Sequence, residues 1–75
     1  MKILIRDSKG KYDKINISES DTVYKLKEII KKRNNITNEI ELIFNGMILE
    51  DSYTIDELDI EDENIIDYLG TFLAG

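Results

Sequence analysis

Residues 22–33, TVYKLKEIIKKR, form the one long stretch of this 75-residue chain with a helical pattern. Its apolar side chains recur at the spacing of a single helix face, at Val23, Leu26 and Ile30. Thr22 is a candidate N-cap, because its hydroxyl can accept a hydrogen bond from an amide of the first turn. Asn34 follows the stretch as a candidate stop. We therefore expect one amphipathic helix, around which the rest of the fold is built.

Alternating apolar and polar residues predict short β-strands before and after this helix. Gly10 lies in the turn between the first two strands, and Asn45-Gly46 is a pair typical of a two-residue hairpin turn. Residues 53–60 predict one short helical turn. The expected strands are residues 1–7, 11–17, 40–44, 47–49 and 64–69. The order predicts an α+β fold, in which one helix packs against a small mixed sheet.

Composition restricts the chemistry that this chain can perform. It has no cysteine and no histidine, so disulfides, Ser–His and Cys–His pairs and most zinc sites are excluded. No apolar run approaches the ~20 residues of a membrane span, and no glycine-rich phosphate loop is present. We expect a non-enzymatic domain without cofactor, metal or membrane contact. The lack of cysteine favours a reducing compartment, the cytoplasm or the nucleus.

Charge is divided unevenly along the chain. Residues 1–33 carry all ten Lys and Arg against five acids, whereas residues 34–75 carry eleven acids and no base. This split predicts one basic and one acidic face. Acids alternate with the lysines and no series of aromatic residues accompanies them, so we expect no nucleic-acid binding. The expected partners are proteins, and the expected state is a monomer.

Several motifs, in this order, resemble ubiquitin and its relatives, the β-grasp family. They are Met1-Lys2-Ile3, Gly10-Lys11, Ser20-Asp21-Thr22, Lys27, Leu42-Ile43-Phe44-x-Gly46, Leu49-Glu50-Asp51, Thr54 and Ile60. The resemblance covers nearly the whole chain. It implies a ββαββ ubiquitin-like domain over residues 1–69, followed by a flexible C-terminal tail at residues 70–75.

The resemblance also implies a role for one lysine of the helix. By the helical pattern alone, Lys27 would lay its aliphatic stem on apolar neighbours and keep its ammonium group in water. In the family the matching lysine is buried and pairs with an aspartate, which corresponds to Asp51 here. The resemblance therefore implies a structural ion pair between Lys27 and Asp51.

A partner-binding surface is expected on the exposed face of the sheet. Alternation directs Leu4, Ile43 and Leu69 to that face, and adjacent exposed apolar residues are typical of partner sites. In the resembled family, receptors and the proteasome contact the positions that match Ser8, Ile43, Gly46, Asp67 and Leu69. This chain has Ser8 where the family has Leu, and Asp67 where it has His.

The end of the chain resembles that of ubiquitin-like modifiers. Gly75 would be the residue whose carboxylate is activated and transferred by dedicated E1–E2-type enzymes, and the activating enzyme would recognise Thr71, Leu73 and Ala74. Two alternatives remain open. The chain could be an integral ubiquitin-like domain that binds the proteasome or another receptor through the Ile43 face, or a sulfur carrier with a thiocarboxylate on Gly75.

Overall fold

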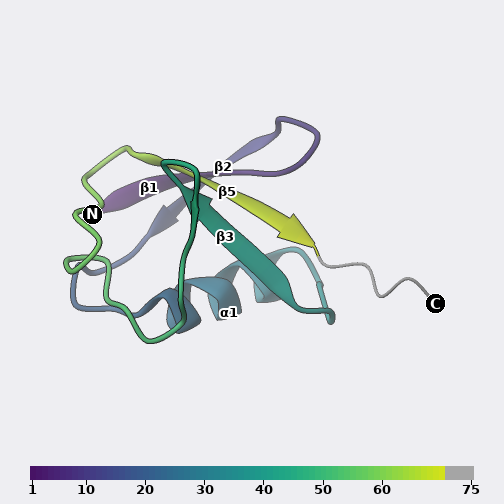
Figure 1. The fold of residues 1–75 in the computed structure, drawn as a ribbon. Helices are drawn as coiled ribbons and strands as arrows, with labels where there is room; N and C mark the ends of the chain where they lie inside the picture. The colour runs from purple at the N-terminus through teal and green to yellow at the C-terminus, as the bar shows by residue number, and fades with distance from the viewer. Residues whose placement is uncertain (71–75) are drawn as a thin grey trace.

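A five-stranded mixed sheet packs over one helix in this computed structural model, which describes residues 1–70 (Figure 1). The elements are β1 (Lys2–Arg6), β2 (Tyr12–Asn16), α1 (Val23–Arg33), β3 (Ile40–Phe44), β4 (Met47–Ile48) and β5 (Ile65–Gly70). The strand order is β2-β1-β5-β3-β4, with β1 parallel to β5 and the other pairs antiparallel. The predicted β-grasp architecture is confirmed.

The core lies between α1 and the face of the sheet that the helix covers. Alternate residues of the strands point into it, as the period of two requires. The helix contributes the stripe expected from its sequence. The most deeply buried side chains are Ile3, Ile5, Ile15, Val23, Leu26, Ile30, Ile40, Leu42, Ile55 and Ile66. In the described part of the chain, no helix or further layer covers the opposite face of the sheet.

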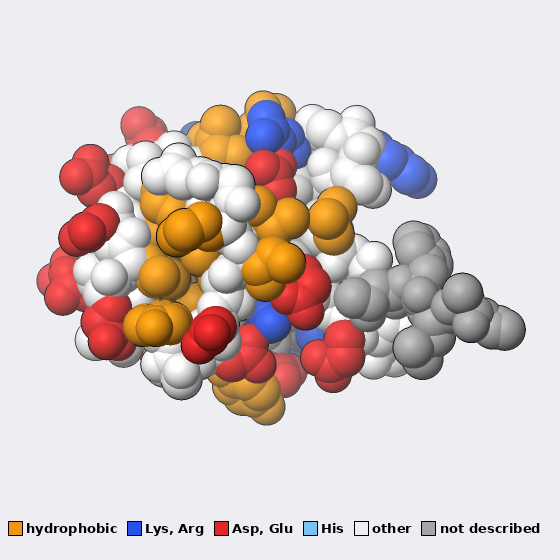
Figure 2. All heavy atoms as spheres, in the orientation of Figure 1, with side chains coloured by type: hydrophobic (Ala, Val, Ile, Leu, Met, Phe, Trp, Pro, Cys, Tyr) orange, Lys and Arg blue, Asp and Glu red, His pale blue; other side chains and the backbone are white. Residues whose placement is uncertain are grey.

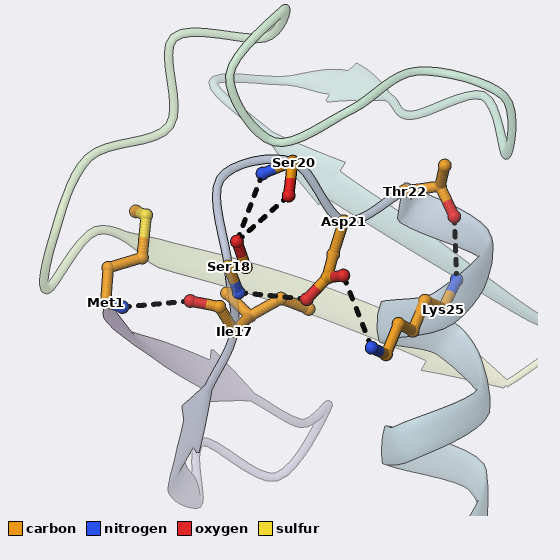
Figure 3. A network of polar contacts seen from close by, with 7 residues as sticks. All are labelled: Met1, Ile17, Ser18, Ser20, Asp21, Thr22 and Lys25. Atoms are coloured by element: carbon orange, nitrogen blue, oxygen red, sulfur yellow. Dashed lines mark hydrogen bonds and ion pairs between the residues drawn. The ribbon is translucent and has the colours of Figure 1, made fainter.

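Local hydrogen bonds fix the point where the chain enters α1 (Figure 3). The Thr22 hydroxyl accepts from the Lys25 amide at 3.2 Å, which makes Thr22 the predicted N-cap. One carboxylate oxygen of Asp21 accepts from the Ser18 amide at 2.9 Å, and the other accepts from the Lys25 ammonium group at 3.3 Å. The Ser18 amide is the main reason that the pKa of Asp21 lies below its ordinary value. The helix therefore starts where the sequence predicts.

Two asparagines lie at the end of α1. The side-chain amide of Asn34 donates to the carbonyl of Ile30 at 2.8 Å, and Asn35 adopts a φ of 54°. Asparagine tolerates this left-handed conformation better than most residues, so the predicted end of the helix is confirmed. Within residues 1–70, no helix is long and apolar enough to cross a membrane.

The turns follow the expected backbone conformations. Gly10 has a φ of 82° in the β1–β2 turn. Asn45 and Gly46 have φ values of 52° and 77°, the two positive values that a type I′ hairpin turn requires. The helical turn predicted over residues 53–60 is reduced to hydrogen-bonded turns, among them one in which the Leu58 amide donates to the Thr54 carbonyl at 3.3 Å.

One boundary differs from the prediction. We expected the last strand to end at Leu69 and the tail to begin at Gly70, but Gly70 belongs to β5 and pairs with Ile40. The strand continues because β3 offers a partner residue at that position. The predicted roles of Thr71, Leu73, Ala74 and Gly75 lie outside the described residues.

Candidate functional site

The face of the sheet opposite α1, here called the outer face, carries one side chain from every second residue of each strand. Its members are Tyr12, Lys14 and Asn16 on β2, Lys2, Leu4 and Arg6 on β1, Ile65, Asp67 and Leu69 on β5, Glu41 and Ile43 on β3, and Ile48 on β4. These residues are all exposed or half-buried, whereas their neighbours along β1, β3 and β5 point toward the core.

Strand register places one residue from each strand in a single row across the outer face. Arg6 lies opposite Tyr12 on one side and Asp67 on the other. Ile43 lies opposite Asp67 and Ile48. Because neighbouring strands are about 5 Å apart, side chains in such a row contact one another. The row is polar over β2, β1 and β5 and apolar over β3 and β4.

Arg6 and Asp67 form a two-point ion pair at the centre of this row. The Arg6 Nε donates to one carboxylate oxygen at 2.5 Å, and Nη2 donates to the other at 3.0 Å. Nη1 donates to the Tyr12 hydroxyl at 3.3 Å, and the guanidinium carbon lies 5.9 Å from the centre of the Tyr12 ring, within cation–π range. The side-chain hydrogen bonds between them raise the pKa of Arg6 and lower that of Asp67.

Apolar side chains border this ion pair on two sides. Leu4 lies opposite Ile65 in the neighbouring row of β1 and β5, and Ile43 lies opposite Ile48 in the same row. Leu69 is exposed further along β5. The outer face therefore combines a polar centre with apolar flanks.

The space-filling view shows how the side chains are distributed around the molecule. Figure 2 shows hydrophobic side chains gathered on the side turned to the viewer and acidic side chains along the left edge. Basic side chains are visible at the top and upper right. Acidic side chains also lie in the lower centre and beside the basic ones at the top, so the view in Figure 2 does not divide into one acidic and one basic face.

The structure brings four of the six predicted surface residues together. Leu4, Ile43, Asp67 and Leu69 lie on the outer face, as expected from their alternation. The other two lie in turns outside the strands, Ser8 between β1 and β2 and Gly46 between β3 and β4. Ser8 and Gly46 therefore border the outer face and do not belong to its strands.

The sequence interpretation missed other members of this face. Arg6, Tyr12, Ile48 and Ile65 were not among the predicted site residues. The alternation of β1 and β5 does place Arg6 and Ile65 outward. What the sequence does not contain is the register of the two parallel strands, which sets Arg6 beside Asp67 although 61 residues separate them.

The ion pair that the resemblance implied between Lys27 and Asp51 is present, and it lies away from the outer face. Lys27 Nζ lies 2.6 Å from Asp51 Oδ1, and Lys27 is the one buried charged residue of the described chain. It joins α1 to the segment after β4, so its contribution is structural.

A pocket near the β1–β2 turn is a weaker candidate. Its volume is about 210 Å³, below the ~300–1,000 Å³ typical of ligand sites. Ile5, Ile15 and Ile30 contribute apolar lining, and Tyr68 lines it as well. Burial, followed by the charges of two nearby aspartates, raises the pKa of Tyr68. No group of three His, Cys, Asp or Glu side chains in residues 1–70 could hold a metal ion.

Comparison with known proteins agrees with the resemblance seen in the sequence. The model of a family described as ubiquitin-2 like Rad60 SUMO-like (Rad60-SLD) matches residues 1–69. No curated protein matches the chain. The match spans all of the elements except the last residue of β5.

Proposed function

This chain belongs to the ubiquitin-2 like Rad60 SUMO-like family, and on that basis we propose that it acts by binding other proteins through the outer face of its sheet. Ubiquitin-like domains generally interact with proteins. In this proposal the chain performs no chemistry of its own, and its specificity resides in the shape and polarity of that face.

One observation carries the proposal, the grouping of exposed and half-buried apolar side chains around an ion pair. Single exposed apolar residues are normal on protein surfaces and need no explanation. Here, however, Leu4 and Ile65 form one adjacent pair and Ile43 and Ile48 form another, on the sheet face that no helix covers in residues 1–70. Contiguous apolar side chains with polar neighbours are typical of partner sites.

The test compares two well-exposed residues on different faces. Ile48 on β4 is 65% exposed and Tyr24 on α1 is 56% exposed, so neither Ile48→Asp nor Tyr24→Asp removes a core contact. Proteins retained on the immobilised wild-type chain are identified, purified and titrated against the two variants. We expect Ile48→Asp to weaken binding at least about tenfold and Tyr24→Asp to have little effect.

The site of binding is then mapped by NMR on the isotopically labelled chain. Chemical-shift changes are expected at Leu4, Ile43 and Leu69. Equal affinity of both variants, or shift changes confined to α1, would show that partners use another surface and would contradict the proposal.

A second proposal is that the chain is conjugated to target proteins through Gly75 by a dedicated E1–E2-type cascade. It is supported by membership of a family described as SUMO-like and by the Ala74-Gly75 sequence beyond β5. Conjugation requires a free carboxylate on Gly75. Binding through the outer face does not, so the outer-face proposal also holds for an integral domain of a larger protein that docks on the proteasome or another receptor.

Conjugation is tested by expressing two tagged chains in cells of the source organism, one ending at Gly75 and one lacking it. Covalent adducts of higher mass that depend on Gly75 are the expected result. If neither chain forms adducts, the integral binding domain is the better description. A mass increase that corresponds to a thiocarboxylate on Gly75 would favour the sulfur carrier instead.

A further inference from the structure

The ion pair at the centre of the outer face keeps part of its hydrogen-bonding capacity unused. A guanidinium group has five N–H donors, and a carboxylate has about four acceptor sites. Arg6 directs two donors to Asp67 and one to Tyr12. Two donors of Arg6 and about half of the acceptor sites of Asp67 are therefore left for water.

Water reaches this pair in the free protein. The side chains of Arg6 and Asp67 are 40% and 37% exposed. A partner that contacts both Leu4–Ile65 and Ile43–Ile48 lies against the pair, because Arg6 and Asp67 are next to Leu4 and Ile65 and Asp67 is also next to Ile43. Binding of such a partner removes water from the remaining donors and acceptors.

A wholly apolar partner would leave these groups buried without hydrogen bonds, which opposes binding. We propose that the Arg6–Asp67 pair selects partners that place a neutral hydrogen-bonding side chain, of the Asn, Gln, Ser or Thr type, over the centre of the outer face and apolar side chains on its flanks. This inference rests on the proposed binding function of the outer face.

The neutral character of the partner group follows from the charge of the pair. Arg6 and Asp67 compensate each other, so the pair offers no uncompensated counter-ion to a charged side chain that is desolvated above it. An amide or hydroxyl supplies both a donor for the free carboxylate sites and an acceptor for the free guanidinium protons. The geometry thus favours a group that can do both.

The probe is a phage-displayed library of random peptides selected on the wild-type chain. Peptides whose binding is lost with Ile48→Asp and kept with Tyr24→Asp are retained as outer-face ligands. We expect each of them to contain a neutral polar residue between apolar ones. Replacing that residue with Ala should weaken binding to the wild-type chain about tenfold.

The matched protein variant is Arg6→Val/Asp67→Val, which replaces the pair by residues that favour strands. On this variant, the Ala-substituted peptide should bind within about twofold of its parent, because the donors and acceptors of the Arg6–Asp67 pair are no longer there to be satisfied. A melting curve establishes that the variant is folded. If it is not, Asp67→Asn and Asp67→Leu provide the comparison, since only the first keeps hydrogen-bonding groups at this position.

The possible outcomes separate this inference from the proposed function. Outer-face peptides without a central polar residue, or with one that contributes equally to both protein variants, would overturn the selection by Arg6–Asp67 and leave the binding face intact. A library that yields no peptide dependent on Ile48 would overturn both the binding face and the selection.

Discussion

Lys27 and Asp51 are joined at 2.6 Å across the edge of the core, but the two side chains differ in solvent exposure. The lysine side chain is 11% exposed and the aspartate side chain is 51% exposed. The carboxylate of Asp51, at the surface, therefore pairs with an ammonium group that α1 holds in the protein interior. This asymmetry predicts that the two partners are not equivalent when replaced.

Asp51→Ala should be more destabilising than Lys27→Met. The first change leaves a buried ammonium group without its partner, at a cost of about 1–3 kcal/mol. The second replaces the lysine by an apolar residue of similar length, a change that is often nearly neutral. Urea denaturation of both variants and of the double variant measures the difference. If Lys27→Met were the more destabilising change, contacts of the ammonium group other than Asp51 would dominate.

Ile43→Ala should leave the fold nearly intact and weaken partner binding. Ile43 lies on the outer face, so its truncation should cost no more than about 1 kcal/mol of folding stability. Leu42→Ala is the matched control, because Leu42 is fully buried beside it and should cost about 2–5 kcal/mol. Thermal melts compare the two variants. A similar loss for both would mean that Ile43 contributes to the core.

Acid should weaken the fold in part through Asp67. Its hydrogen bonds from Arg6 lower its pKa below the ordinary value of 3.8. The associated stabilisation is therefore present above pH 3.8 and is lost as pH falls through the lower pKa of the folded state. We expect Asp67→Asn to show a shallower loss of stability in this range than the wild type. Arg6→Gln should flatten the same part of the curve, and the double variant should add nothing further.

Gly46→Ala should destabilise the β3–β4 hairpin through its backbone alone. A Cβ at Gly46 would contact no atom within 4 Å, but the φ of 77° disfavours a residue with a side chain by about 1 kcal/mol. Gly70 also has open space around it and has no positive φ. Gly70→Ala is therefore expected to be neutral or slightly stabilising. Equal effects in a denaturant titration would argue against backbone strain as the cause.

The general ubiquitin-activating enzyme should charge this chain poorly. In ubiquitin the matching positions of the tail and of strand three are basic, whereas this chain has Thr71, Leu73 and Glu41. An enzyme surface that complements basic groups meets a like charge at Glu41, and like charges at a recognition contact slow encounter and reject the wrong partner. Thioester formation with ATP is compared between the wild type and Glu41→Arg/Thr71→Arg/Leu73→Arg, which should be charged faster. Rapid charging of the wild type would contradict this prediction.

Part of the candidate site was readable from the sequence. Alternation in two strands was sufficient to direct Leu4, Ile43 and Leu69 outward, because successive side chains of a strand point to opposite faces. The turn at Asn45-Gly46 fixed the pairing of Ile43 with Ile48 once its type was known. Neither the alternation nor the turn indicates which residue of β5 lies beside which residue of β1.

The sequence by itself determined the local structure: the helix between Thr22 and Asn34, the glycine-dependent turns and the face to which each strand residue points. These features depend on residues that are near neighbours in the chain. Tertiary structure alone decided that Arg6 lies beside Asp67 and that Gly70 continues β5 opposite Ile40. Such register between distant strands is set by how all of the buried side chains pack together on α1, and no single stretch of sequence contains that sum.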